Sequence, residues 1–176
     1  MKKESSITVF AGGIGPEREI SLATGKALTE SLGKSFEARM LDLTEPGLPA
    51  GIDPENTIVF PAIHGTFGED GTLQTMLEQG GFYYAGSGPE ASRLCMDKRR
   101  SKEVVRDAGV RVARDFVFSD PMEIDVDQVL SELGQDLVLK PTDQGSSVAL
   151  YVLNGKDELT DTLSAIGQGN WMIERR

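Results

Sequence analysis

The stretch TIVFPAIHGTFGEDGTLQTMLEQGG, residues 57–81, decides the fold class. Its first seven residues are rich in β-branched and aromatic side chains, which is typical of a buried strand. From residue 71 the apolar side chains recur at helical spacing and end on two glycines, which predicts a helix over 71–81. A glycine-rich loop containing His64, the only histidine, joins the two. Strand, loop and helix in this order indicate a βαβ unit of a parallel sheet.

The N-terminal segment repeats this pattern. ITVF, residues 7–10, predicts a strand that ends in the glycine-proline turn AGGIGPE. Residues 18–33 follow with apolar side chains at helical spacing, Ile20 among them, and residues 36–43 predict a second strand. A short strand at 83–86 follows the helix over 71–81. Two consecutive units of this kind predict a parallel sheet.

The pattern changes after about residue 95. We expect helices and strands in mixed order, with the strands at 114–119, 137–141, 148–152 and 170–176, and the helices at 96–109, 123–134 and 156–167. The predicted fold class is therefore α/β: a parallel-sheet βαβ domain over 1–95, followed by a partial α+β module over 96–176. The apparent strand at the C-terminal end suggests that the chain is an incomplete fragment of a longer protein.

Composition excludes several classes of function. The 176 residues carry a net charge of −10, which argues against a nucleic-acid or anionic-membrane partner because phosphates attract basic surfaces. No apolar run is long enough for a membrane span or a signal peptide, so we expect a cytoplasmic protein. The single cysteine, Cys95, excludes an internal disulfide, and we expect it to be a buried core residue.

Two loops of the first domain place polar side chains where a ligand would bind. In open parallel sheets, ligands bind beyond the carboxyl ends of the strands, where AGGIGPE and HGTFGEDG both begin. Glu17 and His64 can then face one crevice, the carboxylate toward an ammonium group and the imidazole toward a carboxylate or a reacting proton. Position alone favours simpler roles: His64 as the cap of a strand end, Glu17 as an acid at a helix N-terminus. Glu69 and Asp70 suggest supports that shape and cap the loop.

Two lysines stand out in the second domain. Lys140 ends a predicted strand, and Lys98 lies in the first turn of a helix, where the helix dipole disfavours a cation unless an anion is bound. The segment KPTDQGSS, residues 140–147, combines a strand-end lysine with a loop rich in donors for phosphate oxygens. GSS alone suggests an ordinary hairpin turn, and the basic segment RLCMDKRRSK a solvated helix face. Walker and dinucleotide glycine motifs are absent from the sequence.

Four segments together resemble the D-alanine–D-alanine ligases of the ATP-grasp superfamily. HGTFGEDGTLQ is similar to the N-terminal signature of this family, and VFAGGIGPEREISL to its opening segment. AGSGPEASRLCMDKRRSK is similar to the family's domain junction, and VLKPTDQGSSVAL to its nucleotide-binding loop. The order of the four agrees with the family across nearly the whole chain. The resemblance implies a pre-ATP-grasp substrate domain followed by the first half of an ATP-grasp module.

The resemblance also implies an activity and the residues of a substrate site. Members of the family join two D-alanines with ATP for peptidoglycan synthesis. The carboxylate of the first D-alanine attacks the γ-phosphate, and the amine of the second attacks the resulting acyl phosphate. By residue-for-residue match, Glu17 holds the ammonium group of the first D-alanine and His64 lies beside the substrates. Ser146 ties Glu17 to the closed active-site lid.

The remaining matches concern ATP. Lys98 and Lys140 match the lysines that neutralise the phosphates, and Ser146 and Ser147 match the serines of the nucleotide loop. Glu174 matches an acid that accepts a hydrogen bond from the adenine amino group, with Arg175 beside it in the hinge segment. We expect Glu17, His64, Lys98 and Lys140 to face one cleft.

The sequence departs from the family pattern in three respects. Thr75 stands where the signature has a small residue, and Ala149 replaces the glycine of GSSxG within a predicted strand. The family's third part, which carries the ligands for Mg²⁺, would lie beyond residue 176, so the chain alone is expected to be inactive. The family dimerises through its N-terminal domain, which predicts a homodimer. The alternatives are another ATP-grasp ligase, such as one making D-alanyl-D-lactate, or a truncated non-catalytic binding or dimerisation module.

Overall fold

The computed structural model describes residues 6–145 and 148–176. It divides into two compact units, Met1–Arg93 and Leu94–Arg176, and each is described by itself. The sequence places the domain boundary between residues 95 and 96, and the roles given there to the two domains stay predictions. In the described part of the chain, no helix has both the length and the apolar character needed to cross a membrane.

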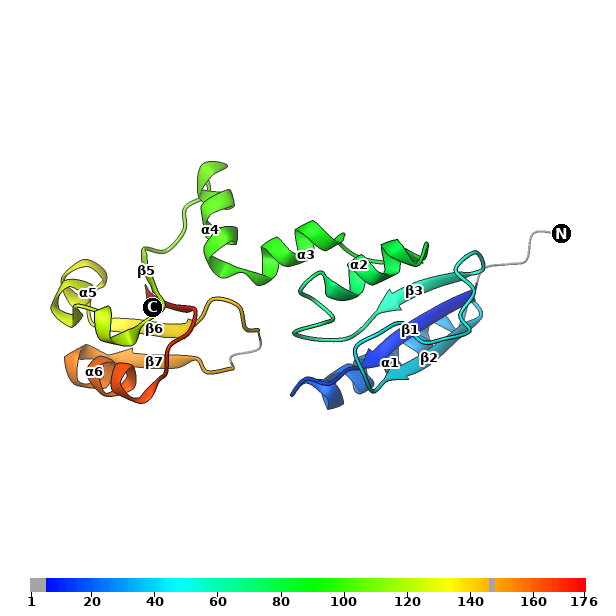
Figure 1. Ribbon diagram of the computed structural model, residues 1–176, viewed down its shortest axis with the longest axis horizontal. Coiled ribbons are helices and arrows are strands. Elements are labelled where there is room, and N and C mark those ends of the chain that lie inside the picture. Colours follow the sequence, from blue (N-terminus) through cyan, green and yellow to red (C-terminus); the bar gives the residue numbers. More distant parts are fainter. Residues whose placement is uncertain (1–5, 146–147) are drawn as a thin grey trace. The chain divides into compact units, whose positions relative to one another are not determined.

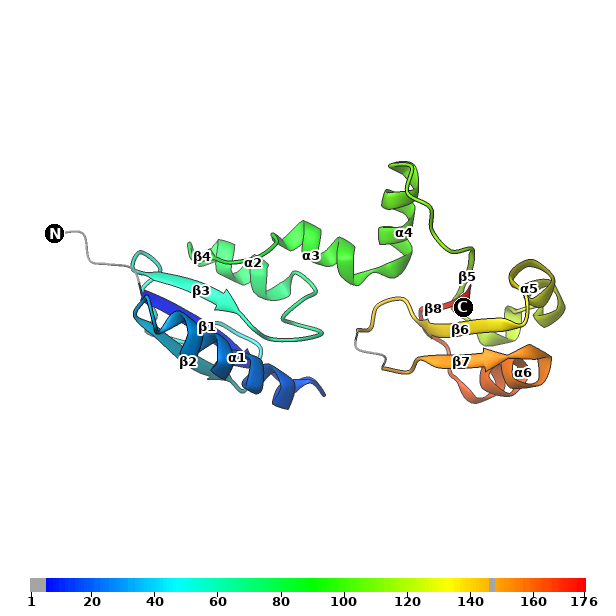
Figure 2. The same cartoon turned by 180° about the vertical axis from the view of Figure 1, so that it is seen from behind.

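The first unit contains a parallel four-stranded sheet in the order β2-β1-β3-β4, as the two βαβ patterns predict (Figures 1 and 2). The chain leaves β1 toward β2 on one side and leaves β3 toward β4 on the other, so the order reverses between β1 and β3. The elements are β1 (Ser6–Gly12), α1 (Arg18–Leu32), β2 (Ala38–Leu43), β3 (Thr57–Pro61), α2 (Thr72–Gln79), β4 (Tyr83–Tyr84) and the start of α3 (Pro89–Met96).

The two helices of these units cover opposite faces of the sheet. Val9 and Ala11 of β1 are buried against α1, whereas the neighbouring Phe10 points to the other face and packs with Leu73 and Leu77 of α2. Successive side chains of a strand alternate between faces, so one strand supplies both cores. The apolar side chains that recur at helical spacing in residues 71–81 thus include the core residues Leu73 and Leu77.

Helix α1 packs on the sheet through small residues. Ser21 and Gly25 are its buried positions, and a Cβ on Gly25 would clash with Ala11 and lie 3.0 Å from Sδ of Met40. Glycine at this position therefore lets the helix approach the sheet closely. Ile20, expected on the apolar face of this helix, is 59% exposed. Leu22, Leu28 and Leu32 of the same predicted face do pack against the core, but the fully buried positions of the helix are Ser21 and Gly25.

The second unit contains an antiparallel four-stranded sheet in the order β5-β8-β6-β7. Helices α5 and α6 pack together over one face, where apolar side chains of both helices and of all four strands form the core. The elements are the end of α3, then α4 (Lys98–Asp107), β5 (Asp115–Phe118), the 3-10 turn η1 (Pro121–Glu123), α5 (Val126–Leu133), β6 (Asp136–Pro141), β7 (Tyr151–Asn154), α6 (Gly155–Ala165) and β8 (Trp171–Arg175).

The other face of this sheet carries polar side chains close together. In the register, Asp115 is opposite Glu174, and Lys140 is opposite Met172. These four positions alternate with core residues and therefore share the face that α5 and α6 do not cover.

Three local predictions are wrong. Residues 89–96 form a helix, α3, that the sequence analysis did not expect. Strand β7 begins at Tyr151 and not at residue 148, and Ala149 lies in a turn with a φ of 51°. An L-residue other than glycine enters this left-handed region at a steric cost, so the family's glycine at this position has a physical reason. Cys95, expected in the core, is exposed.

Candidate functional site

The buried side chain of Ser21 on helix α1 makes hydrogen bonds to the carboxyl ends of both β1 and β3. Oγ of Ser21 donates to the carbonyl of Ala62 at 2.6 Å and accepts the Gly12 N–H at 2.8 Å. This hydroxyl holds together the starts of the two loops at the point where the strand order reverses. Such a switch point is where open parallel sheets bind ligands.

The two predicted residues of this region lie on facing loops. A Cβ built on Gly65, the residue after His64, would lie 2.9 Å from Oε2 of Glu17. The Glu17 carboxylate is therefore packed against the backbone of the HGTFGEDG loop. Gly65 also has a φ of 71°, so both its conformation and its neighbour favour glycine. The prediction that the two loops share one edge of the sheet is confirmed by this approach.

His64 is held from both sides of its ring. Nε2 lies 3.2 Å from Oγ1 of Thr24 on α1, and Nδ1 lies 3.4 Å from Oε1 of Glu69. The second carboxylate oxygen of Glu69 accepts the Gly65 N–H at 2.9 Å. Glu69 is thus a support of the loop, as predicted, and it is also a partner of the imidazole. The sequence analysis did not identify Thr24.

Asp70 shapes the end of the same loop. Its two carboxylate oxygens accept the N–H groups of Phe67 and Thr72, each at 2.9 Å. Burial alone would raise the pKa of Asp70, but the bonds from Phe67 and Thr72 outweigh burial and lower it. Phe67 is buried with a φ of 78°, an uncommon conformation that the hydrogen bond from its N–H to Asp70 helps to hold. Asp70 therefore has the capping role predicted for it, one residue before the N-cap, Gly71.

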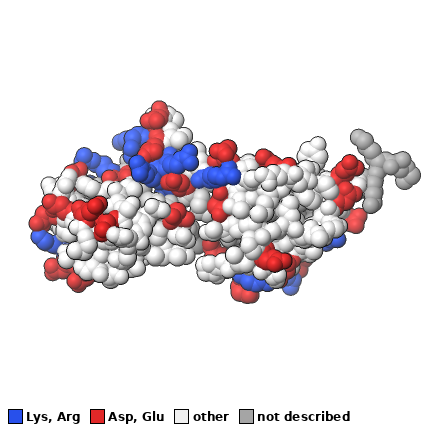
Figure 3. Space-filling model, viewed as in Figure 1, with Lys and Arg blue, Asp and Glu red and all other residues white. Residues whose placement is uncertain are grey.

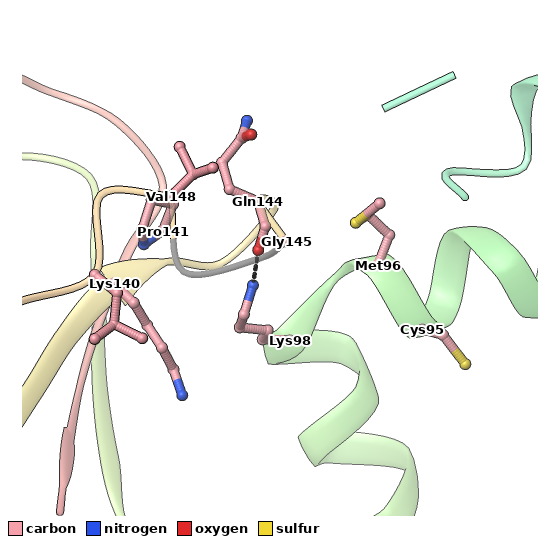
Figure 4. A pocket seen from close by; sticks show the side chains of 9 residues that line it. Cys95, Met96, Lys98, Lys140, Pro141, Gln144, Gly145 and Val148 are labelled. Carbon is pink, nitrogen blue, oxygen red and sulfur yellow. Dashed lines mark hydrogen bonds between the residues drawn. The ribbon is translucent and has the colours of Figure 1, made fainter. Parts of the chain in front are cut away.

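The second unit brings Lys98 and Lys140 to one cavity (Figure 4). Lys98, the first residue of α4, donates through Nζ to the carbonyl of Gln144 in the loop after β6, and its N–H donates to Thr142. Lys140 enters the same cavity from β6. Burial and the neighbouring ammonium of Lys140 lower the pKa of Lys98. Two ammonium groups that line one cavity could neutralise the charge of a polyanion.

Glu174 joins this cluster from β8. Its Oε1 accepts a hydrogen bond from Nζ of Lys140, and its Oε2 accepts one from Nζ of Lys102 at 3.0 Å. Burial would raise the pKa of Glu174, but the hydrogen bonds from Lys140 and Lys102 outweigh it and lower the pKa. All three side chains line a second cavity of about 330 Å³, together with Lys98, Met172 and Cys95.

Lys102 is a residue of this site that the sequence analysis missed. Lysine and arginine side chains gather around α4 (Figure 3), as expected for a solvated basic face. The side chain of Lys102, however, is only 15% exposed and lies 2.6 Å from Oδ1 of Asp115. Its spacing of four residues from Lys98 places both on one side of the helix, which is the signal that could have identified it.

The other predicted residues lie apart from this cluster or outside the described chain. Arg175 is exposed and, by strand alternation, its side chain leaves β8 on the face opposite Glu174. Ser146 and Ser147 lie outside the described residues. Glu17 and His64 belong to one unit and Lys98 and Lys140 to the other, so their expected convergence on one cleft stays a prediction. Within residues 6–145 and 148–176, no group of three or more acidic, histidine or cysteine side chains could hold a metal ion.

Comparison with known proteins shows one consistent similarity. A profile described as the D-ala D-ala ligase N-terminus matches residues 47–87. The D-alanine–D-alanine ligase of Clostridium beijerinckii is 38% identical over 168 residues, which cover 90% of this chain and 52% of that protein. The ligase of Nitrosospira multiformis is 40% identical over 82% of this chain and 47% of its own length. The chain therefore spans about half the length of the curated relatives it matches.

Solved structures agree with the sequences. The D-alanine–D-alanine ligase from Bacillus anthracis complexed with ATP has a TM-score of 0.82 at 30% identity and covers 98% of this chain and 57% of its own. A D-alanyl-alanine synthetase from Vibrio cholerae has a TM-score of 0.84 at 24% identity, over 100% of this chain and 60% of its own. The second similarity shows the fold alone.

Proposed function

Because the chain belongs to the D-alanine–D-alanine ligase family and spans the N-terminal half of its members, we propose that it supplies the first-substrate site and part of the ATP site of such a ligase. The proposed reaction joins two D-alanines to D-alanyl-D-alanine, a precursor for peptidoglycan, in the cytoplasm. The proposal is carried by one observation: Lys98 and Lys140, from different elements, line one cavity with Glu174 nearby.

The first step is transfer of the γ-phosphoryl group. A carboxylate oxygen of the first D-alanine attacks the γ-phosphorus of ATP, ADP leaves, and an acyl phosphate forms. Lys98 and Lys140 fit this step because their ammonium groups can neutralise phosphate oxygens and lower the repulsion between two anions. The two serines at 146 and 147 are proposed to donate to the same phosphates.

The second step joins the amino acids. The amine of the second D-alanine attacks the acyl carbon, and the bond from that carbon to the phosphate oxygen breaks, releasing phosphate. Glu17 is proposed to hold the ammonium of the first D-alanine, since its carboxylate lies against the backbone of the facing loop. His64, whose ring nitrogens contact Thr24 and Glu69, is proposed to lie beside the substrates.

Nucleotide selection is assigned to β8. Glu174 is proposed to accept a hydrogen bond from the adenine amino group, and Arg175 to contribute to the hinge through its backbone. Magnesium would supply further charge neutralisation for phosphoryl transfer, from ligands expected beyond Arg176. The homodimer contact is proposed to lie on the first unit, as the resemblance to the family implies.

The test uses the natural gene product and, in parallel, the 176-residue chain. With ATP, magnesium and D-alanine, the gene product is expected to release phosphate and form D-alanyl-D-alanine, detected by mass spectrometry. The 176-residue chain is expected to show negligible turnover. A gene product that forms an ester with D-lactate but no dipeptide, or that has no turnover, would overturn the proposal. Glu17→Gln is expected to abolish turnover while leaving ATP binding unchanged, because Glu17 is proposed to bind D-alanine and the lysines to bind ATP.

A further inference from the structure

Five charged side chains of the second unit alternate in sign. Lys140 contacts Glu174, Glu174 contacts Lys102, Lys102 contacts Asp115, and Asp115 lies 3.5 Å from Nη2 of Arg106. They come from β6, β8, α4 and β5, so the series crosses the face of the sheet that α5 and α6 leave uncovered. The side chains of Lys102 and Asp115 are each 15% exposed, so these charges are partly desolvated and depend on one another.

The position of Lys140 creates a conflict within the proposed ATP site. Its ammonium is paired with Glu174, the carboxylate proposed to receive the adenine amino group. The same ammonium is proposed to neutralise phosphate. A lysine that turns toward a phosphate lengthens or breaks its bond to Glu174, which leaves the partly buried carboxylate with one cation fewer. Burial disfavours the charged form of a carboxyl group, so Glu174 needs a second cation to stay ionised.

Lys102 is placed to be that cation. It donates to Oε2 of Glu174, the oxygen that Lys140 does not use, so its bond is independent of Lys140. Asp115 lies 2.6 Å from the same ammonium, in an ion pair that lacks the geometry of a directed hydrogen bond. The charge of Asp115 holds the lysine head group at this point, and the thioether of Met172 lies 3.9 Å from it.

We infer that Lys102, anchored by Asp115, is a positioning residue that keeps Glu174 ionised and oriented for base recognition when Lys140 engages phosphate. The inference rests on the proposed function, because it takes the cluster to be the adenine end of the ATP site. An ionised Glu174 accepts from the amino group of adenine and repels the carbonyl oxygen at the same position of hypoxanthine. A protonated Glu174 would donate to that oxygen, so loss of Lys102 is expected to weaken the discrimination between the two bases.

The experiment measures dissociation constants of ATP and inosine triphosphate for the natural gene product, by calorimetry in the presence of magnesium. For Lys102→Met, ATP binding is expected to weaken about tenfold and the preference for ATP over inosine triphosphate to fall by about tenfold, the scale of one charged hydrogen bond. Lys102→Arg retains the charge and is expected to restore most of the preference. Arg99→Met is the matched control, because Arg99 is on the same helix, is 61% exposed and pairs with Glu103.

The binding constants test the role of Lys102 and the proposed ATP site separately. A wild-type protein that binds neither nucleotide overturns both. A wild-type protein that prefers ATP, together with a folded Lys102→Met variant that keeps the full preference, overturns the inference alone. If thermal unfolding shows that Lys102→Met does not fold, Lys102→Gln replaces it with the same expected loss of preference. If Arg99→Met loses the preference for ATP over inosine triphosphate to the same extent, the inference is also contradicted. The loss would then follow from removing one positive charge anywhere on the helix.

Discussion

Oε1 of Glu69 lies 3.4 Å from Nδ1 of His64, while the other oxygen of the same carboxylate accepts the Gly65 N–H. An ionised carboxylate can only accept hydrogen bonds, so Nδ1 of a neutral His64 must carry the proton if it is to bond Glu69. Nε2 then faces Thr24 as an acceptor. The loop thereby selects one tautomer of the imidazole and leaves the lone pair on the side of helix α1.

This tautomer can be observed directly, because His64 is the only histidine of the chain. At a pH where the ring is neutral, long-range ¹H–¹⁵N correlation spectra are expected to show Nδ1 protonated. Glu69→Gln should reduce this bias, since an amide can either donate or accept. Glu78→Gln is the control, because Glu78 bonds Tyr84 instead. A wild-type spectrum with the proton on Nε2 would contradict the prediction.

Asp70 gives the loop a pH-dependent stability. Its pKa is lowered in the folded state, so its contribution is present above the unfolded value near 3.9 and is lost as pH falls through the folded value. Asp70→Ala is expected to reduce the free energy of unfolding by about 1–2 kcal/mol at pH 7, since two N–H groups lose their acceptor. The difference from wild type should shrink at pH 3.

Urea unfolding of both proteins at the two pH values measures this change. Asp70→Asn keeps an acceptor oxygen but cannot ionise. At pH 7 it should therefore be less destabilised than Asp70→Ala, and its stability should lack the pH dependence that Asp70 contributes. A difference between Asp70→Ala and wild type that is the same at both pH values would show that the carboxylate charge is irrelevant.

Much of the first unit could be predicted from the sequence because its signals are local. The strand at 57–61 and the helix at 72–79 follow from residue type and periodicity. The approach of Glu17 to the loop after His64 followed from a general rule on the carboxyl ends of parallel strands. Helix α3 was missed although Pro89 begins it, a position that favours proline.

The charged cluster of the second unit could not be predicted in the same way. The bond between Lys102 and Glu174 joins residues 72 positions apart, and only the packing of helix α4 near strand β8 brings them together. Ile20 shows a different failure: its apolar character suggested burial, but it is exposed, while the fully buried positions of the helix are the small Ser21 and Gly25. Pattern predicts which elements form, whereas the side-chain partners depend on tertiary geometry.

The turn before β7 holds Ala149 in a strained backbone conformation that glycine would adopt more easily. Ala149 has a φ of 51°, where an alanine costs about 1 kcal/mol relative to glycine. Ala149→Gly is therefore expected to raise the free energy of unfolding slightly, by up to about 1 kcal/mol, despite the greater entropy of the unfolded chain. Ala113→Gly, in the same unit but without a positive φ, is the control and should be neutral or destabilising. Thermal unfolding measures both, and a destabilised Ala149→Gly would contradict the assigned turn.

Gly65 provides a direct test of the proposed substrate site. Its Cβ would lie 2.9 Å from Oε2 of Glu17, so Gly65→Ala is expected to displace this carboxylate as well as to strain the backbone at a φ of 71°. Gly81→Ala is a matched control, because Gly81 has a φ of 74° and nothing within 4 Å of the added atom. Each variant should lose about 1 kcal/mol of stability.

Only Gly65→Ala is expected to raise the KM for D-alanine, by about tenfold or more, because only there does the new methyl group move the proposed ammonium ligand. The KM for ATP should be unchanged in both variants, since the proposed phosphate and adenine contacts belong to the other unit. Steady-state kinetics of the natural gene product, with each substrate varied in turn, measure these constants. Equal effects of the two variants on D-alanine would show that backbone strain alone is responsible, and Glu17 would then lose its proposed role.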